Sequence, residues 1–219
     1  MQLRTTPAKV ETRLCGVLLV AIAVGCAAAH ESDLEVDRLV GELSLAQGKR
    51  VADVGAGHGE FSELLARIVG RGGHVYATEV DEDDLQDIRD RLEDTGLGNA
   101  TVILGDQHDT GLPESCCDAI LLRLVYHHFT EPAEMRASLR RALRPGGRIA
   151  VVDLPPQRGW SELDGVPDRG GHGIPLEDLV AEMTGDGFAV VSRHEAWDTD
   201  ENDTYCVVFE RSATASAVP

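Results

Sequence analysis

Residues 50–62 read RVADVGAGHGEFS. The short apolar run Val51 to Val54 is typical of a buried strand. Apolar residues then recur at positions 61, 64, 65, 68 and 69, which is the spacing of a helix that buries one face. Glycine tolerates positive φ and lets a ligand approach the backbone closely, so the glycine-rich turn between strand and helix is a candidate binding loop.

The spacing of its glycines separates this loop from two common phosphate-binding loops. Gly55, Gly57 and Gly59 give the pattern G-x-G-x-G. A nicotinamide- or flavin-dinucleotide loop has a glycine or alanine at the sixth position, where this chain has Glu60. No Lys-Ser or Lys-Thr pair follows, as it would in a P-loop. The ligand is therefore expected to be something other than a dinucleotide or a nucleoside triphosphate.

Three acidic residues stand at or near the ends of successive predicted strands: Asp53, Glu79 and Asp106. Glu79 comes 20 residues after Gly59, where a carboxylate can accept hydrogen bonds from both hydroxyls of a ribose. Asp106 is placed to accept a hydrogen bond from an exocyclic amine. Together the three acids would repel a pyrophosphate, and they favour a ligand that carries positive charge.

The rest of the chain alternates predicted strands and helices. Strands are expected at 51–54, 74–79, 101–104, 119–122, 149–152, 188–194 and 205–209, and helices at 34–43, 61–69, 85–92, 132–143 and 176–183, with Pro145-Gly146-Gly147 closing the fourth helix. Such alternation predicts βαβ units, a mostly parallel sheet and helices on both of its faces. Ligands of these sheets bind outside the carboxyl ends of the strands. The long loop 154–175, which contains Trp160, is expected to cover the substrate.

Five segments, taken in order, resemble the class I S-adenosylmethionine-dependent methyltransferases. They are VADVGAGHGEFS (51–62), VYATEVD (75–81), GDQHDTGLPESCCDAILL (105–122), VYHHF (125–129) and LRPGGRIAVVD (143–153). The resemblance implies an α/β fold of Rossmann-like, doubly wound type. Its mostly parallel seven-stranded sheet would have the order 3-2-1-4-5-7-6 with strand seven antiparallel. It also implies S-adenosylmethionine as cofactor and methyl transfer as activity.

The same resemblance implies a set of cofactor-binding residues. The glycines would lie under the methionine part of the cofactor, with Asp53 near its ammonium group. Glu79 would bind the ribose and Val80 would pack on the adenine, while Asp106, with Gln107 beside it, would lie near the adenine amine. The full set is Asp53, Gly55, Ala56, Gly57, His58, Gly59, Glu79, Val80, Asp106, Gln107 and Arg123.

Tyr126, His127 and His128 directly follow the fourth predicted strand and are the candidates for a catalytic role. Neutral imidazole titrates near working pH and can act as a base, although a packing role stays open for all three residues. His172 can cap the last helix or line the mouth of the site. No metal site is predicted, because His108, His127, His128 and His172 lack regular ligand spacing.

The chain carries a formal charge of −18 at pH 7 and has a pI near 4.7. This charge opposes nucleic-acid binding, which needs cationic surface, and favours a small-molecule methyl acceptor. The alternative function is a non-catalytic module that binds S-adenosylmethionine or S-adenosylhomocysteine at the cell envelope. A nicotinamide oxidoreductase is opposed by the glycine spacing.

The chain has five cysteines, too few for a disulfide framework. The adjacent pair Cys116-Cys117 is compatible with a thiolate site, since some methyltransferases of this fold methylate arsenic held by cysteines. Buried, unreactive sulfur is the favoured interpretation of the pair.

Residues 1–29 have the composition of an export leader, with basic residues before the uncharged run 14–25 and small residues after it. Cleavage before His30 would release the chain, whereas Ala23-Val24-Gly25-Cys26 resembles a lipoprotein box that would leave a lipidated Cys26 attached to the membrane. An uncleaved anchor or a wrongly assigned start is also open. We therefore expect a leader at 1–29, a methyltransferase domain at 30–211 and a tail at 212–219. The expected location is the cell envelope, either periplasmic or lipid-anchored, or the cytoplasm if the leader is no export signal.

Overall fold

The computed structural model describes residues 34–158, 164–197 and 203–212. The chain divides into two units, Met1–Asp37 and Arg38–Pro219, and of the first unit the four described residues are helical. The strands of the second unit are β1 (Arg50–Val54), β2 (His74–Glu79), β3 (Ala100–Leu104), β4 (Cys117–Arg123), β5 (Leu143–Asp153), β6 (Phe188–His194) and β7 (Tyr205–Arg211). Its helices are α2 (Glu60–Val69), α3 (Glu82–Asp94), α4 (Pro132–Ala142) and α5 (Leu176–Gly185), with a 3-10 turn at Tyr126–His128. Residues 38–42 are also helical.

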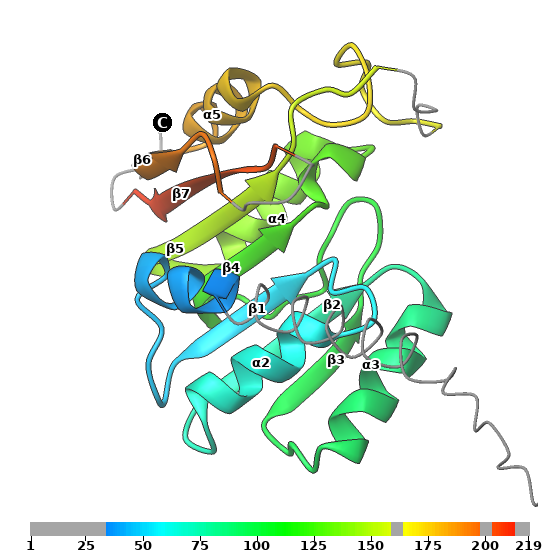
Figure 1. Ribbon diagram of the computed structural model, residues 1–219, viewed down its shortest axis with the longest axis vertical. Coiled ribbons are helices and arrows are strands. Elements are labelled where there is room, and N and C mark those ends of the chain that lie inside the picture. Colours follow the sequence, from blue (N-terminus) through cyan, green and yellow to red (C-terminus); the bar gives the residue numbers. More distant parts are fainter. Residues whose placement is uncertain (1–33, 159–163, 198–202, 213–219) are drawn as a thin grey trace, which may run out of the picture. The chain divides into compact units, whose positions relative to one another are not determined.

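The seven strands form one sheet in the order β3-β2-β1-β4-β5-β7-β6 (Figure 1). Strands β1 to β5 pair in parallel, and β7 runs antiparallel to both β5 and β6. This confirms the predicted fold class, strand order and antiparallel seventh strand. Strands are added toward one edge of the sheet from β1 to β3 and toward the other edge from β4 onward. The carboxyl ends of β1 and β4 therefore flank the switch point, where ligands bind in such folds.

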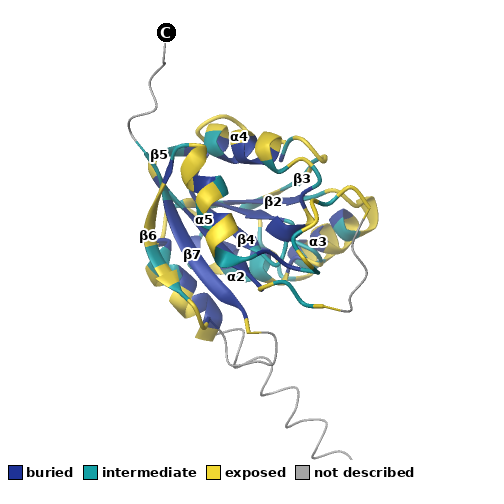
Figure 2. Cartoon of the chain, turned by 90° about the horizontal axis from the view of Figure 1, so that it is seen from above, coloured by how far each residue is buried: buried dark blue, intermediate teal, exposed yellow. Residues whose placement is uncertain are grey.

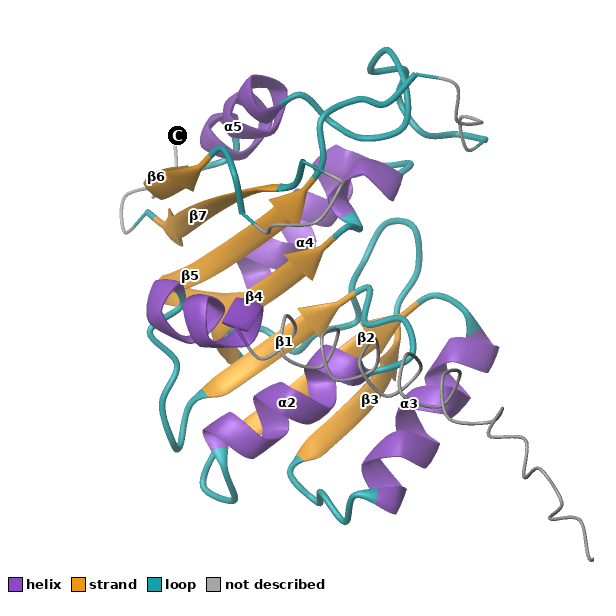
Figure 3. Ribbon diagram, viewed as in Figure 1, coloured by secondary structure: helices purple, strands orange, loops and turns teal. Residues whose placement is uncertain are grey.

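Helices cover both faces of the sheet, as predicted (Figure 3). On one face, Val51 of β1 belongs to the same buried cluster as Leu65 and Val69 of α2. On the other face, Val54 shares a cluster with Leu139 of α4. The central strands are accordingly buried, whereas edge strand β6 is largely exposed (Figure 2).

The start of β5 differs from the prediction. The strand begins at Leu143, directly after α4, and not at 149. Leu143 pairs with Cys117, and the register then shifts before Ala119 pairs with Arg148. Pro145-Gly146-Gly147 therefore lies inside an irregular first part of the strand. The prediction was wrong because Pro and Gly are turn signals, but they also occur at strand starts and bulges.

Cys116 and Cys117 are both buried and are joined to each other in a disulfide, a pairing that the sequence did not indicate. Among the described residues, no helix has both the length and the apolar character needed to cross a membrane. The leader, Trp160 and most of the predicted turn 198–203 lie outside the described residues.

Candidate functional site

A cavity of about 390 Å³ lies at the carboxyl edge of the sheet. Its walls come from the ends of β1 and β2, from the loops that follow β1, β2, β3 and β4, and from one residue each of α3 and α4. The lining residues are Val54, Gly55, Gly57, Thr78, Glu79, Val80, Asp84, Gly105, Asp106, Gln107, Thr110, Leu124, Val125, His128, Phe129, Thr130 and Met135. The volume falls within the range of about 300–1,000 Å³ that is usual for small-molecule sites.

The glycine loop needs glycine because another loop lies against it. Gly55 has a φ of 71°, and a Cβ there would lie 2.4 Å from the Cγ2 atom of Val125. Gly57 has a φ of 51°, with no atom within 4 Å of a Cβ built on it. Val125 therefore covers the loop at Gly55, whereas the space beside Gly57 is open and a ligand can approach there.

Glu79, at the end of β2, is held in place by backbone amides. The Gly57 N–H donates to Oε2 at 3.0 Å, and the Val80 N–H donates to Oε1 at 2.7 Å. Each carboxylate oxygen keeps a second lone pair, so Glu79 can still accept two hydroxyl groups. Val80 is 58% exposed and presents an apolar surface next to the carboxylate.

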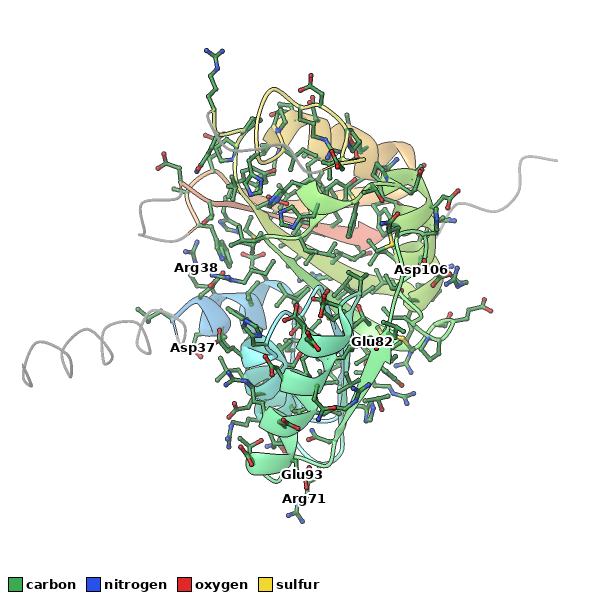
Figure 4. All side chains as sticks on the ribbon, turned by 90° about the vertical axis from the view of Figure 1, so that its right-hand side faces the viewer. Asp37, Arg38, Arg71, Glu82, Glu93 and Asp106 are labelled. Carbon is green, nitrogen blue, oxygen red and sulfur yellow. A yellow bond between two sulfur atoms is a disulfide. The ribbon has the colours of Figure 1, made fainter. Side chains whose placement is uncertain are left out.

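Asp106 closes the turn after β3, and it is labelled in Figure 4. Its Oδ1 accepts the N–H groups of His108 and Asp109, both at 2.8 Å. These bonds fix the carboxylate at the wall of the cavity beside Gln107.

Asp53 lies behind the glycine loop and does not line the cavity. It is 2% exposed, and its Oδ2 accepts a 2.6 Å hydrogen bond from the hydroxyl of Ser62 on α2. Burial raises the pKa of Asp53 to about 6, and the negative charge of Glu79 acts in the same direction. The geometry places Asp53 as a support between β1 and α2.

Four other predicted residues also lie outside the cavity lining: Ala56, His58, Gly59 and Arg123. The side chain of His58 is 68% exposed and lies near the carboxylates of Asp84 and Asp87. The guanidinium of Arg123 lies over the ring of Phe61, 4.8 Å from its centroid. The cavity thus brings together six of the predicted residues: Gly55, Gly57, Glu79, Val80, Asp106 and Gln107.

The cavity is acidic. Glu79, Asp84 and Asp106 line it, and no Lys or Arg is found among the described residues of its wall. Because carboxylates repel phosphate and attract cations, this wall suits a cationic ligand and opposes a pyrophosphate.

Residues 52–151, which include every lining residue of this cavity, match a family model described as a methyltransferase domain. The comparison therefore assigns this stretch a likeness to methyltransferase domains, in agreement with the resemblance seen in the sequence. A ubiquinone/menaquinone biosynthesis C-methyltransferase, UbiE, from Vibrio cholerae is 31% identical over 108 residues, which are 49% of this chain and 42% of that protein. The chain spans less than half the length of these curated relatives.

Solved structures share the fold. An S-adenosylmethionine-dependent methyltransferase from Aquifex aeolicus superposes with a TM-score of 0.66 at 22% identity, covering 80% of this chain and 88% of that one. The cyclase SpnF superposes with a TM-score of 0.65 at 17% identity, covering 80% of each chain. The predicted fold is thereby confirmed, and the match of residues 52–151 supports the predicted family and its cofactor, S-adenosylmethionine.

The cavity has residues that fit S-adenosylmethionine. Glu79 offers two acceptor oxygens to a ribose, and the exposed side chain of Val80 offers an apolar surface to a purine. Asp106 adds an acceptor for an amine, while Gly57 leaves open space beside the loop. The negative wall matches the sulfonium and ammonium charges of the cofactor.

Several residues of the cavity wall were not predicted from the sequence. Leu124, Val125, Phe129 and Thr130 all belong to the segment after β4, within or next to the VYHHF motif. Leu124 has a positive φ of 55°, a strained conformation for a branched side chain that is typical of functional sites. The motif was the available signal, but only its polar residues were singled out as candidates.

Tyr126 is fully buried, away from the cavity lining. Its hydroxyl donates to Glu182 Oε2 at 2.7 Å and accepts from Arg136 Nη1 at 3.0 Å. Burial, together with the charge of Glu182, raises the pKa of Tyr126 well above its usual value. These contacts favour a packing role, in which Tyr126 joins α4 to α5.

His127, His128 and His172 form a cluster beside the cavity, of which His128 is also a lining residue. His127 is 3% exposed; its Nδ1 lies 2.6 Å from Asp153 Oδ1 and its Nε2 lies 3.2 Å from His172 Nε2. His128 lines the cavity, and burial together with the two neighbouring imidazoles lowers its pKa to about 4. His128 is thus neutral at physiological pH. His172 is not among the residues that line this cavity.

Proposed function

We propose that the chain transfers the methyl group of S-adenosylmethionine to a small-molecule acceptor. The observation that carries the proposal is the acidic cavity at the switch point of the sheet, with Glu79 held in its wall by the Gly57 amide. The name of the Vibrio relative, a C-methyltransferase of quinone biosynthesis, supports a small acceptor. The net charge of −18 supports the same choice over a nucleic acid.

The sulfonium methyl of the cofactor is already activated for transfer. The protein's part is therefore to hold donor and acceptor in line, with the reacting atoms about 3 Å apart. Glu79 and Asp106 would orient the nucleoside half of the donor, and the apolar side chains of Leu124, Val125 and Phe129 would keep water from the reacting centre.

Calorimetry with the full chain tests the donor site. S-adenosylmethionine and S-adenosylhomocysteine should both bind with micromolar Kd. Glu79→Gln should weaken this binding by about 10- to 100-fold, because it removes one to two charge-assisted hydrogen bonds. Glu82→Gln, which makes the same charge change at an exposed position in the first turn of α3, is the control. An absence of binding at millimolar ligand would overturn the proposal.

A second assay separates transfer from binding alone. The cyclase SpnF shares this fold, so the fold by itself does not decide the reaction. We expect tritium from methyl-labelled S-adenosylmethionine to appear in at least one member of a panel of phenols, amines, thiols and carboxylic acids. Binding without transfer across the panel would favour the non-catalytic alternative.

We also propose that the chain is exported and held at the cell envelope through a lipidated Cys26. The support is the leader composition of residues 1–29 and the sequence Ala23-Val24-Gly25-Cys26. Cell fractionation and the mass of the mature N-terminus test this, with Cys26→Ser as the variant that should lose membrane attachment. An intact N-terminus in the cytosol, where S-adenosylmethionine is made, would contradict it.

A further inference from the structure

We propose that His127, His128 and His172 bind a divalent transition-metal ion, with Zn²⁺ the best fit, beside the donor cavity. Their candidate ligand atoms all lie within 4.8 Å of one another. The Nε2 atoms of His127 and His172 are 3.2 Å apart. Two nitrogens on a tetrahedral zinc ion are about 3.3 Å apart when each Zn–N bond is about 2.0–2.1 Å. His128 is exposed, so rotation of its ring can supply the third nitrogen.

Asp153, at the end of β5, orients the most buried of the three ligands. It is fully buried; its Oδ1 lies 2.6 Å from His127 Nδ1 and its Oδ2 accepts the His127 N–H at 3.2 Å. Its Oδ1 also accepts the Leu154 N–H at 2.8 Å. A carboxylate that receives the Nδ1–H of an imidazole leaves the lone pair on Nε2, and this carboxylate–histidine pairing is usual behind bound metals.

The space between the imidazoles suits one ion. A cavity of about 20 Å³ lies there, lined by His127, His128, Val166, Pro167, Gly171, His172 and Gly173. About 10–15 Å³ is the least that accommodates a single water molecule, so there is room for one small ion and little else. The chemistry of the wall, three imidazoles, is that of a nitrogen-ligand metal such as zinc.

The backbone holds His172 in position before any ion binds. The Gln157 N–H donates to the His172 carbonyl at 2.8 Å, and the His172 N–H donates to the Gln157 carbonyl at 3.2 Å. A Cβ on Gly173 would lie 2.6 Å from the Leu154 carbonyl oxygen, so glycine is needed for the two segments to lie this close. Ligands held in this way lose little freedom on binding.

Three protein ligands leave a fourth position of a tetrahedral ion open, as in catalytic zinc sites. His128 lines both this small cavity and the donor cavity, so the ion would lie next to the methyl donor. Resting on the proposed function, we infer that the acceptor binds the ion through a hydroxyl oxygen. The ion lowers the pKa of that hydroxyl, its proton passes to water, the S–CH₃ bond breaks and the O–CH₃ bond forms.

Metal binding is measured first, without any methyl donor. The full chain, stripped with a chelator, should bind one equivalent of Zn²⁺ by calorimetry and give a Co²⁺ spectrum of a four-coordinate site. Acetohydroxamate should change that spectrum if one position is open. His172→Ala, at a half-buried position, should weaken Zn²⁺ binding by at least about 100-fold, and Asp153→Asn by about 10- to 100-fold.

Two controls identify the site. His108→Asn should leave Zn²⁺ affinity unchanged, because His108 lies apart from the cluster and pairs with Glu134 at 2.7 Å. His58→Asn tests the other group with ligand geometry, His58 with Asp84 and Asp87 on the surface, and should also have no effect. Unchanged affinity in both His128→Ala and His172→Ala, or a thiolate-to-cobalt absorption band, would overturn the metal site.

S-adenosylhomocysteine binding is measured on the same variants. It reports that the fold is intact, and it separates the two proposals. Zinc binding without S-adenosylhomocysteine binding would refute the proposed function and leave the metal site standing, and the reverse result would refute the metal site alone.

Discussion

Replacing Asp53 by Asn tests the electrostatics of the support behind the glycine loop. The carboxyl is 2% exposed, and burial raises its pKa from 3.8 to about 6. Below pH 3.8 both the folded and the unfolded chain hold the proton, and no penalty exists. As the pH rises toward 6, the unfolded chain releases its proton first, so the free energy of unfolding falls and stays low above pH 6. The full penalty is about 3 kcal/mol.

The asparagine carries no charge, and its side-chain oxygen can still accept the hydrogen bond from Ser62. We therefore expect Asp53→Asn to be more stable than the wild type at pH 8. The difference in unfolding free energy should grow by about 1–2 kcal/mol between pH 5 and pH 8, because part of the titration falls in this window. Urea unfolding followed by circular dichroism at several pH values measures it.

Asp94→Asn is the matched control, since it removes the same charge from an exposed position at the end of α3. Its difference from wild type should stay constant over the same pH range. If the difference in unfolding free energy between Asp53→Asn and wild type also stayed constant with pH, the pKa of Asp53 would not be raised in the folded state, and the reasoning would be refuted.

Three further changes test other contacts of the protein. Gly55→Ala forces a Cβ against Val125 at a positive φ and should cost about 3 kcal/mol, seen as a loss of about 9 °C in Tm, together with loss of S-adenosylhomocysteine binding. Gly57→Ala has the same backbone strain in open space and should cost only about 1 kcal/mol; equal losses in the two variants would contradict the packing argument. Tyr126→Phe removes the hydroxyl that donates to Glu182 and should cost about 1–2 kcal/mol while kcat and its pH profile stay unchanged; a large fall in kcat would instead assign Tyr126 to the chemistry.

The sequence predicted the parts of the fold that depend on local pattern. Alternating apolar strands and amphipathic helices were enough for the α/β class, and the order of the five family segments was enough for the strand order. The start of β5 was missed because Pro145-Gly146-Gly147 has the same composition in a turn and in a bulged strand. No local sequence signal distinguishes a turn from a bulged strand here. The pairing of Leu143 with Cys117 on the neighbouring strand makes the segment part of β5.

Some residues of the site could likewise be placed from the sequence, and others could not. Gly57, Glu79 and Asp106 could be placed because each stands at or just after the end of a strand, and strand ends meet in space. The histidine cluster could not, because His172 is 45 residues beyond His127 and is brought back by the bridge between residues 157 and 172. Ligand spacing along the chain is informative only when the ligands share one element. Asp53 was placed correctly on its strand, but the side of the sheet it faces, toward Ser62, follows from packing.

The contact between Gly55 and Val125 packs the loop after β1 against the loop after β4, two parts of the cavity wall. The segment that carries His127 and His128 also braces the turn under the donor, so amino-acid changes there disturb both partners of the reaction at once. New acceptor preferences should therefore arise mainly outside this segment, in the stretch after β5, where substitutions can occur without weakening donor binding. Libraries that diversify 155–170 should yield more active variants than libraries of equal size at 124–129.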